Sequence, residues 1–344
     1  MKNSASKKVL FLSLSGIGNL IMQLPTIEAA KKAHPDWHIT VWVAPRGTKA
    51  IAEVQPYIDS VLEMPIKANL FQHIQNLFTL RQHTFDIGIV LSPGQLVKSA
   101  AYLKLAGVPV RIGNSYPYKG NKENSKFLTH AILEDPKLHD IEQNLQLLGP
   151  LDIHEQSPFY SLYIPEKNIQ EAEQYSGKSF IGIHAGCATG FEFKRWPLER
   201  FAEVAQELLK KNMDTKFLIF GGTDEESQKQ ELVQRIGVNS AESISASLLT
   251  TAAIMQHCKL FISNDSGLMH IAAAVGVPTI GIFGPTDEHQ TGPRGPKSYI
   301  LRAPGTKPVY TTESFHDLGA TPPDTLLAIT SEMVIDKIEE YALI

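Results

Sequence analysis

The segment from Asn264 to His270 combines residue types that bind anions. It follows a short apolar run that predicts a strand, and it leads into a helix predicted over Leu268–Val275. Asp265 or Ser266 can cap this helix, because their side-chain oxygens accept hydrogen bonds from its first backbone N–H groups. The other N–H groups of the turn, such as that of Gly267, have no partner inside a helix and suit phosphate. We therefore predict an anion site at this turn.

Two side chains of this segment have two interpretations each. Asp265 is either a helix cap alone or also a hydrogen-bond partner for a sugar hydroxyl. His270 lies four residues after Ser266, so the two residues face the same side of the helix. His270 is therefore either structural or a neighbour of a bound phosphate.

A second set of anion-binding residues follows the strand predicted over Phe180–His184. The turn from Ala185 to Gly190 is rich in small residues, which leave backbone N–H groups open to phosphate. Lys194 and Arg195 then stand just before a helix predicted over Pro197–Lys211, where cations are unfavourable unless an anion is near. They are either two solvated charges or anion ligands, and we favour diphosphate binding by Lys194.

Two further turns follow predicted strands of the same half of the chain. The turn from Gly221 to Glu226 places Glu225 and Glu226 at the start of a helix, as the helix dipole favours. A carboxylate in that position can also accept hydrogen bonds from two ribose hydroxyls. The segments Gly284–Asp287 and Thr291–Gly295 form a rigid loop after the last predicted strand, on the same side.

The first predicted strand also ends in a glycine-containing turn. Gly16 and Gly18 allow a tight connection and the close approach of a ligand. The turn lacks the full G-x-G-x-x-G pattern of dinucleotide-binding folds, because Ile21 stands at the third glycine position. It is either a plain strand-to-helix connection or a loop that faces a ligand.

Short apolar runs alternate with amphipathic stretches along the chain, which predicts an α/β protein with mainly parallel sheets. The pattern breaks in a polar loop, Asn114–Asp135, and in a linker within Asp152–Lys178, and then restarts. Strands are predicted over Val9–Leu14, His38–Val43, Val61–Met64, Asp86–Leu91, Val108–Ile112, Phe180–His184, Lys216–Phe220, Leu260–Ser263 and Pro278–Phe283. Helices are predicted over Asn19–His34, Asn69–Gln82 with Leu70, Ile74, Leu77 and Phe78 on one face, Gln95–Ala106, Leu138–Leu148, Pro197–Lys211, Glu225–Ile236, Leu248–Cys258, Leu268–Val275 and Leu326–Tyr341.

These elements predict two Rossmann-like, doubly wound domains that face a cleft. We place the first domain at residues 1–160 and the second at residues 161–325, and we expect the C-terminal helix, residues 326–344, to pack back on the first domain. Ligands of such sheets bind at the carboxyl ends of the strands. With two domains, the natural place for a ligand is the cleft between them.

Composition excludes several classes of protein. The chain has 344 residues, of which 43% are hydrophobic and 20% charged, so it is not disordered. Two cysteines, Cys187 and Cys258, exclude a disulfide framework and a four-cysteine metal site, and they fit a reducing cytosol. No apolar run has the length of a signal peptide core or a membrane-spanning helix, so we expect a soluble, cytoplasmic protein. The P-loop, H-E-x-x-H and G-x-S-x-G motifs are absent from the sequence.

The charge is uneven along the chain. A net charge of −4 argues against a general nucleic-acid binder. Residues 1–160 nevertheless hold 16 Lys and Arg against 13 Asp and Glu. This excess is either chance variation of the surface or a sign that the N-terminal half meets an anionic partner.

Together these segments resemble glycosyltransferase family 9, the ADP-heptose:lipopolysaccharide heptosyltransferases. The resemblance extends in family order over about residues 8–295, and its most specific part is the segment from Asp265 to Ala274. The segments that carry it are Gly16–Gly18 with Leu24 and Pro25, Asp86–Ala101, Leu105–Pro109, Arg111–Gly113, Lys194–Pro197, Gly221–Gly222, Asp265–Ala274, Phe283–Thr286 and Thr291–Pro293.

The resemblance implies the GT-B fold, with the donor on the C-terminal domain and the acceptor on the N-terminal one, beside Gly16 and Gly18. It implies an inverting transfer that needs no metal or other cofactor. It also implies roles for individual residues. Lys194, Ser266 and Gly267 would hold the diphosphate with His270 close to it, Asp265 would meet the donor sugar, Glu225 or Glu226 would bind the ribose, Thr189 would lie in a donor loop, and adenine would lie near Ala246 and Ser247.

One departure from the family concerns the general base. The family has Asp after the Gly-x-Gly turn, where it removes the proton of the acceptor hydroxyl, whereas this chain has Asn19. An amide cannot accept that proton. Another group serves as base, the acceptor needs less activation, turnover is slow, or the protein binds a nucleotide sugar without transferring it. Asp59 and Glu63 are candidates for a substitute base because they flank the third predicted strand.

We therefore expect a glycosyltransferase that moves heptose from ADP-heptose onto a lipopolysaccharide or a related glycan. Its partners would be the nucleotide sugar and the glycolipid acceptor, without nucleic acid, and peripheral contact with the inner membrane surface is a further expectation. Three alternatives stay open: a GT-B transferase with another nucleotide-sugar donor, a nucleotide-sugar epimerase, and a non-catalytic or weakly active nucleotide-sugar-binding homologue.

Overall fold

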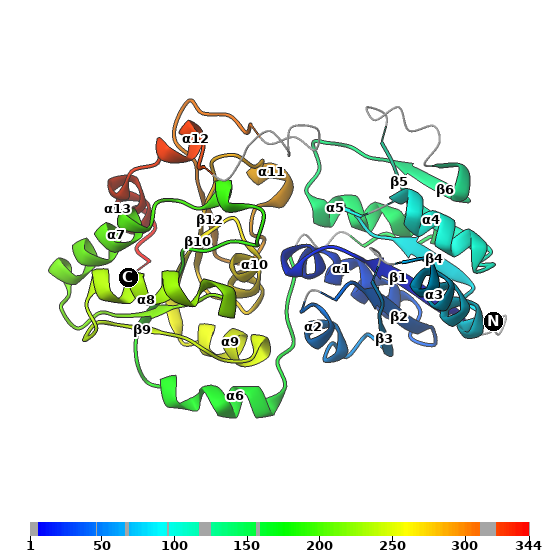
Figure 1. Ribbon diagram of the computed structural model, residues 1–344, viewed down its shortest axis with the longest axis horizontal. Coiled ribbons are helices and arrows are strands. Elements are labelled where there is room, and N and C mark those ends of the chain that lie inside the picture. The colour runs from blue at the N-terminus through cyan, green and yellow to red at the C-terminus, as the bar shows by residue number, and fades with distance from the viewer. Residues whose placement is uncertain are drawn as a thin grey trace. The chain divides into compact units, whose positions relative to one another are not determined.

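The chain folds into two compact units, Met1–Tyr163 and Ile164–Ile344, and each is described by itself (Figure 1). The computed structural model describes residues 6–45, 47–65, 69–94, 96–116, 125–155, 159–309 and 321–343. The division falls close to the domain boundary predicted between residues 160 and 161. None of the helices in these ranges has both the length and the apolar character that crossing a membrane requires.

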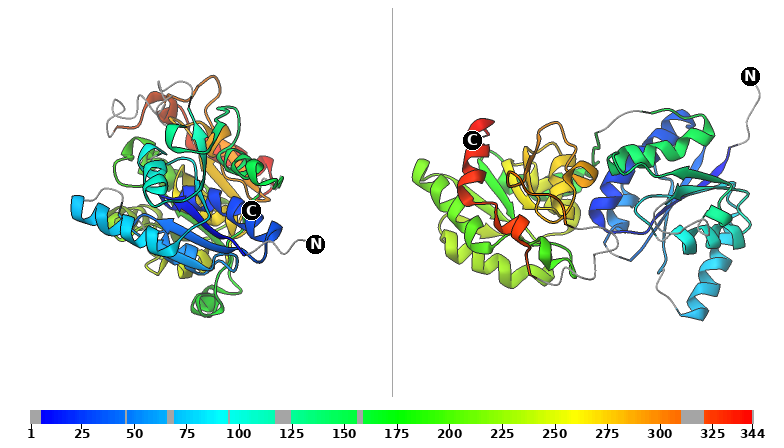
Figure 2. Two further views of the ribbon diagram at one scale, coloured as in Figure 1. Left: turned by 90° about the vertical axis from the view of Figure 1, so that its right-hand side faces the viewer. Right: turned by 90° about the horizontal axis from the view of Figure 1, so that it is seen from above.

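Unit 1 contains, within its described residues, a parallel sheet of six strands in the order β3-β2-β1-β4-β5-β6. The order reverses between β1 and β4, and sheets of this kind bind ligands at the carboxyl ends of such a strand pair. Helices α1 and α5 pack together on one face, and α3 and α4 lie on the other face (Figure 2). The strands are β1 Lys8–Ser13, β2 His38–Val43, β3 Ser60–Glu63, β4 Ile87–Val90, β5 Val110–Ser115 and β6 His130–Leu133. The helices are α1 Ile17–Ala33, α2 Lys49–Glu53, α3 Leu70–His83, α4 Leu96–Leu105 and α5 Asp140–Leu145.

Unit 2 repeats this topology in its described part, with the strand order β12-β11-β10-β7-β8-β9. Its own first strand, β7, lies beside its fourth, β10, so the order again reverses between them. The strands are β7 Phe180–His184, β8 Lys216–Ile219, β9 Ala241–Ser243, β10 Cys258–Asn264, β11 Thr279–Ile282 and β12 Ser298–Leu301. The helices are α6 Glu166–Ala172, α7 Leu198–Lys211, α8 Glu226–Ile236, α9 Leu248–Met255, α10 Gly267–Ala274, α11 Glu288–Thr291, α12 Asp324–Leu327 and α13 Ser331–Glu340.

The predicted α/β class with two doubly wound halves is confirmed, and some predicted loops hold further elements. Strand β6 lies inside the predicted loop Asn114–Asp135, of which residues 117–124 fall outside the described residues. Helix α6 lies inside the predicted linker, and β9 and β12 were not predicted. All are short or lie at sheet edges, where apolar periodicity is weakest.

The C-terminal helix differs from its prediction in extent and in packing. Two helices, α12 and α13, replace the single predicted one, and both belong to unit 2 rather than packing back on the first domain. Val334, Ile335 and Ile338 of α13 share one face and are buried in the core of unit 2, where α13 packs against α7. The apolar face of α13 is thus buried within its own unit.

Truncation of that face tests the role of α13. We expect Ile338→Ala to lower the free energy of unfolding of unit 2 by about 2–5 kcal/mol, because it leaves a cavity in a fully packed core. Amide hydrogen exchange would show this as faster exchange in β7, β8 and β10, with β1 and β4 of unit 1 unchanged. Met213→Ala, at a residue that is 83% exposed, is the control and should change neither unit. Faster exchange in unit 1 alone would contradict the assignment.

Candidate functional site

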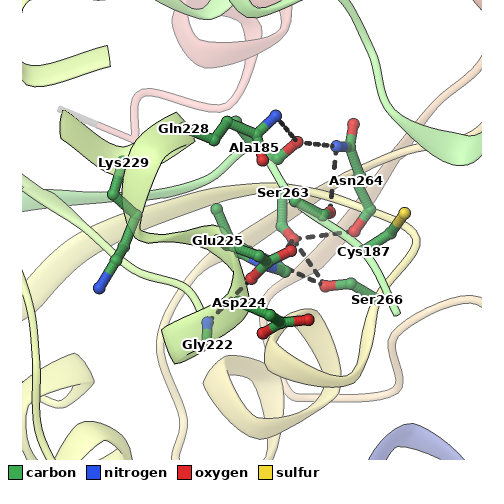
Figure 3. Close-up of polar contacts among 12 residues, drawn as sticks. Ala185, Cys187, Gly222, Asp224, Glu225, Gln228, Lys229, Ser263, Asn264 and Ser266 are labelled. Carbon is green, nitrogen blue, oxygen red and sulfur yellow. Dashed lines mark hydrogen bonds and ion pairs between the residues drawn. The ribbon is translucent and has the colours of Figure 1, made fainter. Parts of the chain in front are cut away.

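A group of polar and charged residues of unit 2, with Glu225 and Ser266 among them, gathers at the carboxyl ends of β7 and β10, where the strand order reverses (Figure 3). His184 is the last residue of β7, and Asn264, the last residue of β10, is followed by Asp265 and Ser266. The Asn264 side chain joins the two strand ends, because its amide nitrogen donates to the carbonyl oxygens of Ala185 and Gly186 at 2.7 and 3.2 Å. The strand ends are therefore held in a fixed relation.

Helix α10 begins at this edge with a capped N-terminus. Ser266 has extended backbone angles, and its hydroxyl oxygen accepts a hydrogen bond from the N–H of Met269 at 3.3 Å. Of the two predicted caps, Ser266 is therefore the one that forms, which leaves Asp265 for another role. Helix α10 is buried almost throughout, so its N-terminal N–H groups lie in a fixed and partly desolvated setting.

Asp265 forms a buried ion pair with Lys194. The Lys194 Nζ lies 2.6 Å from Asp265 Oδ2, which also accepts a hydrogen bond from the Thr286 hydroxyl at 2.8 Å. Burial alone would raise the pKa of Asp265, but the Lys194 ammonium, the charge of His270 and the Thr286 hydroxyl outweigh it and hold this pKa below its usual value. Asp265 is thus a fixed carboxylate that holds the Lys194 ammonium beside the N-terminus of α10.

Lys194 is positioned by its own segment as well. It ends the short 3₁₀ turn Glu192–Lys194, and its Nζ lies 5.3 Å from the centre of the Phe191 ring, within cation–π range. The Lys194 side chain is 17% exposed to solvent. The ammonium is therefore held on two sides while still open to a ligand.

His184 joins the two halves of the site. Its Nδ1 lies 2.9 Å from the Ser266 hydroxyl, and its Nε2 lies 3.1 Å from Glu225 Oε2, with all three side chains buried. From the sequence, His184 is predicted only as the end of a strand, without a role in the site. The feature of the sequence that could have identified it is a histidine at the end of an otherwise apolar strand, at the point where the strand order reverses.

Glu225 lies closer to the centre of the site than Glu226. Its Oε2 accepts a hydrogen bond from the N–H of Gly222 at 2.9 Å, and its Oε1 lies 4.0 Å from the Arg195 guanidinium (Figure 3). Burial would raise the pKa of Glu225, but the hydrogen bond and charge of His184, with the help of Gly222 and Arg195, hold it below its usual value. Oε1 is buried and has no hydrogen-bond partner among the described residues, so its capacity as an acceptor is unused.

Gly186 is the reason that Glu225 fits so closely against the strand end. A Cβ atom at this position would lie 1.7 Å from Glu225 Oε1, so any other residue would displace the carboxylate. Glu226, by contrast, pairs with Lys229 at 2.7 Å and faces the end of β9 through Ser243. The two acids left open by the sequence therefore differ in environment, and only Glu225 contacts His184.

Of the other residues predicted to bind the sugar donor, Thr189 and Ser247 lie at the same edge of the sheet but apart from this cluster, whereas His270 interacts with it. The Thr189 hydroxyl donates to Asp224 at 3.1 Å on the exposed rim. Ser247 caps α9, accepting from the N–H of Thr250 at 3.3 Å, after the outer strand β9. His270 is buried in α10, and its electrostatic interaction with Asp265 helps to lower the pKa of that carboxyl group.

Unit 1 has a different kind of edge at its own switch point. Gly16 is the N-cap of α1, and Gly18 and the half-buried Asn19 lie in the first turn, which contains no acidic residue. The Ser15 hydroxyl donates to the carbonyl of Pro93 in the loop after β4. Within the described residues, the first turn of α1 therefore holds no carboxylate that could replace the expected Asp.

The two candidate substitute bases lie at opposite edges of that sheet. Asp59 precedes β3, pairs with Lys31 at 2.9 Å and accepts from the N–H of Ile39, so it lies at the amino edge, away from Asn19. Asp59 is therefore wrong as a candidate. Glu63 ends β3 at the carboxyl edge, where its neighbour in register is Val43, which in turn pairs with Ser13.

Comparisons with known proteins agree with this architecture. The sequence model of Glycosyltransferase family 9 (heptosyltransferase) matches residues 74–315. Lipooligosaccharide heptosyltransferase 2 of Haemophilus influenzae is 26% identical, with 96% of this chain and 98% of the relative covered. The structure of ADP-heptose lipopolysaccharide heptosyltransferase II from Escherichia coli is similar with a TM-score of 0.77, at 21% identity and 98% coverage of both chains. An E. coli heptosyltransferase with ADP-2-deoxy-2-fluoro heptose has a TM-score of 0.72, at 21% identity and with 97% and 99% of the two chains covered. These similarities show the GT-B fold.

The lowered pKa values of Asp265 and Glu225 predict that unit 2 loses stability in acid. A carboxylate with a lowered folded pKa stabilises the native state above its unfolded pKa, near 4, and this contribution is lost as the pH falls through the folded pKa. We expect Asp265→Asn to lower the free energy of opening of β7 and β10 at pH 7 by about 2 kcal/mol and to make its acid dependence shallower. The loss is below the ~3–5 kcal/mol of a fully buried pair, because Lys194 is partly exposed.

Amide hydrogen exchange between pH 7 and pH 3 measures both effects. Asp214→Asn, which removes an exposed carboxylate from a turn of the same unit, is the matched control and should leave the profile unchanged. An Asp265→Asn profile that coincides with the original one would contradict the role given to the ion pair.

Proposed function

Since the chain belongs to glycosyltransferase family 9, we propose that it transfers heptose from ADP-heptose onto a lipopolysaccharide acceptor with inversion at the anomeric carbon. One observation carries the proposal: the Lys194–Asp265 pair lies beside the capped N-terminus of α10. A diphosphate needs a cation and open N–H groups together, and this turn offers both. The choice of heptose and of lipopolysaccharide follows from the names of the relatives.

In the proposed reaction the acceptor hydroxyl attacks the anomeric carbon while the bond from that carbon to the diphosphate oxygen breaks. ADP leaves with the developing negative charge. Lys194 and the N–H groups of Gly267 and Leu268 stabilise this charge, in the way that fixed dipoles and cations usually do. The proposal therefore needs no metal ion at the diphosphate.

The donor's two sugars are assigned to the two buried carboxylates. Lys194 and Thr286 share Asp265 Oδ2, so we assign Oδ1 to a hydroxyl of the heptose. Glu225 Oε1 retains acceptor capacity, so we assign it to the ribose hydroxyls in preference to Glu226. Adenine would then extend along the edge toward Ser247, with Thr189 on the rim.

The proposed reaction lacks an assigned general base for the proton of the acceptor hydroxyl. Asn19 can accept a hydrogen bond from the acceptor hydroxyl and orient it, but it cannot take its proton. We therefore propose slow transfer limited by acceptor activation. The same residue favours a second candidate function, a homologue that binds the nucleotide sugar without transferring it.

Donor binding is tested by calorimetric titration with ADP-heptose, ADP, UDP and GDP. We expect ADP-heptose and ADP to bind and UDP and GDP not to. Lys194→Ala should weaken ADP binding about 10–100-fold, the equivalent of about 1.5–3 kcal/mol for a lost hydrogen bond between charged groups. Lys210→Ala, at a lysine that is 71% exposed on α7, should bind as the original protein does. Tighter binding of UDP or GDP would overturn the donor assignment.

Acceptor activation is tested by restoring a carboxylate. We expect Asn19→Asp to raise the rate of heptose transfer at least about tenfold, because a positioned general base typically contributes ~10²–10⁴-fold. Asn19→Ala, which removes the side chain without adding a base, is the control and should not raise the rate. Equal rates for the original protein and the Asn19→Asp variant would point to a different base. No transfer by either protein, with ADP-heptose still bound, would favour the non-catalytic function.

A further inference from the structure

Helix α3 exposes its apolar face to solvent. Leu70, Phe71, Ile74 and Phe78 follow the helical spacing of a single face and are 77%, 66%, 58% and 62% exposed. The residues that α3 buries are Asn76 and Leu80. A surface helix normally does the reverse and buries its apolar stripe. This arrangement leaves four large apolar side chains without cover in the described part of unit 1.

Helix α4 extends the same surface. Val97 and Leu105, which are 42% and 57% exposed, lie two turns apart on one face, with Ala101 between them. A groove of about 300 Å³ runs between the two helices and is lined mainly by apolar atoms from Ile74, Leu77, Ala101 and Leu105. Exposed apolar areas of this kind mark interaction sites. We call these exposed residues of α3 and α4, with the groove, the α3–α4 face.

The charged residues that α3 and α4 themselves carry are all of one sign. Neither helix contains Asp or Glu, whereas Arg81, Lys98 and Lys104 lie on them. In the sequence from Met64 to Lys122 the only acid is Asp86, and its carboxylate accepts a hydrogen bond from the N–H of Lys8 at 2.8 Å. An apolar surface with a rim of Lys and Arg is complementary to a bilayer that carries anionic headgroups.

The position of this face relative to the acceptor turn adds a second argument. In parallel α/β sheets each helix starts at the carboxyl edge of the strand before it, so Leu70, Phe71 and Val97 lie at that edge of unit 1. Asn19 lies at the same edge, and its loop is bonded to Pro93, three residues before α4. Figure 2 shows α3 standing out from the rest of unit 1. Leu70 and Phe71, the two most exposed residues of the face, thus lie at the same edge of the sheet as Asn19.

We propose that the α3–α4 face docks on the surface of an anionic membrane. Its apolar side chains enter the boundary between headgroups and acyl chains, and Arg81, Lys98 and Lys104 meet lipid phosphates. The choice of a membrane rests on the proposed function, because a lipopolysaccharide acceptor is anchored in lipid. Docking at this face brings such an acceptor to the edge that holds Asn19.

Vesicle sedimentation of the full chain tests the proposal. The probes are vesicles of phosphatidylcholine with 30% phosphatidylglycerol and vesicles of phosphatidylcholine alone. We expect binding to the anionic vesicles that falls at high salt, and at least tenfold weaker binding to the neutral ones. Phe71→Ser with Phe78→Ser should reduce binding to anionic vesicles at least tenfold. Met213→Ser with Val238→Ser, at two exposed apolar residues of unit 2, is the matched control and should bind like the original protein.

Three results would overturn the proposal. The first is a failure of the original protein to bind anionic vesicles. The second is equal binding by the Phe71→Ser and Phe78→Ser double variant, with its fold confirmed by circular dichroism. The third is a dimer in sedimentation velocity that the double substitution dissociates, which would assign the face to a second copy.

Calorimetry with ADP-heptose separates the docking proposal from the proposed function. Binding of ADP-heptose without binding of vesicles overturns the docking face alone. Binding of vesicles without binding of ADP-heptose overturns the donor assignment alone.

Discussion

The parallel pairing of β7 with β10 is the constraint on which the candidate donor site depends. His184 lies opposite Ser263 in this register, so Ser266, three residues further on, comes within hydrogen-bond distance of the imidazole. A shift by one residue would turn His184 to the other face of the sheet and separate Glu225 from Ser266. Because the strand order reverses at this pair, the connections leave in opposite directions and the N-terminus of α10 stays open. Register and topology therefore assemble the site before any ligand binds.

The candidate donor site contains both cations and carboxylates, so its charges largely compensate each other. Lys194 is already paired with Asp265, and Arg195 lies near Glu225, so the cations of the site face buried carboxylates. In the function that we propose, an incoming diphosphate would share Lys194 with Asp265, which would disfavour anions that cannot also offer hydroxyl groups to the carboxylates. A nucleotide sugar carries anionic phosphates and sugar hydroxyl groups, whereas inorganic phosphate has no sugar hydroxyls. Because buried pairs of charges contribute little net energy, the pairing of cations with carboxylates would favour specific binding over tight binding.

How far the sequence predicts the structure differs between these features. The alternation of apolar runs predicts the two doubly wound halves, and the turn after β10 predicts the capped helix, because both are encoded locally. His184 could not be assigned from its neighbours in sequence, since its partners Glu225 and Ser266 are distant along the chain and only the sheet brings them together. The same holds for the choice between Glu225 and Glu226, which depends on the space left by Gly186.

For helix α3, the sequence predicts the helix but not the surroundings of its apolar face. The spacing of Leu70, Ile74, Leu77 and Phe78 predicts a helix with an apolar face, and the helix forms, but most of that face is exposed. Periodicity reports that a face is apolar and does not report what covers it. The fold of unit 1 is complete without this face, because its core is closed by Leu80, Leu103 and the strands beneath them. Large apolar side chains kept outside a finished core lower solubility and add nothing to that core, so their presence is better explained by a surface that they meet than by the folding of the unit.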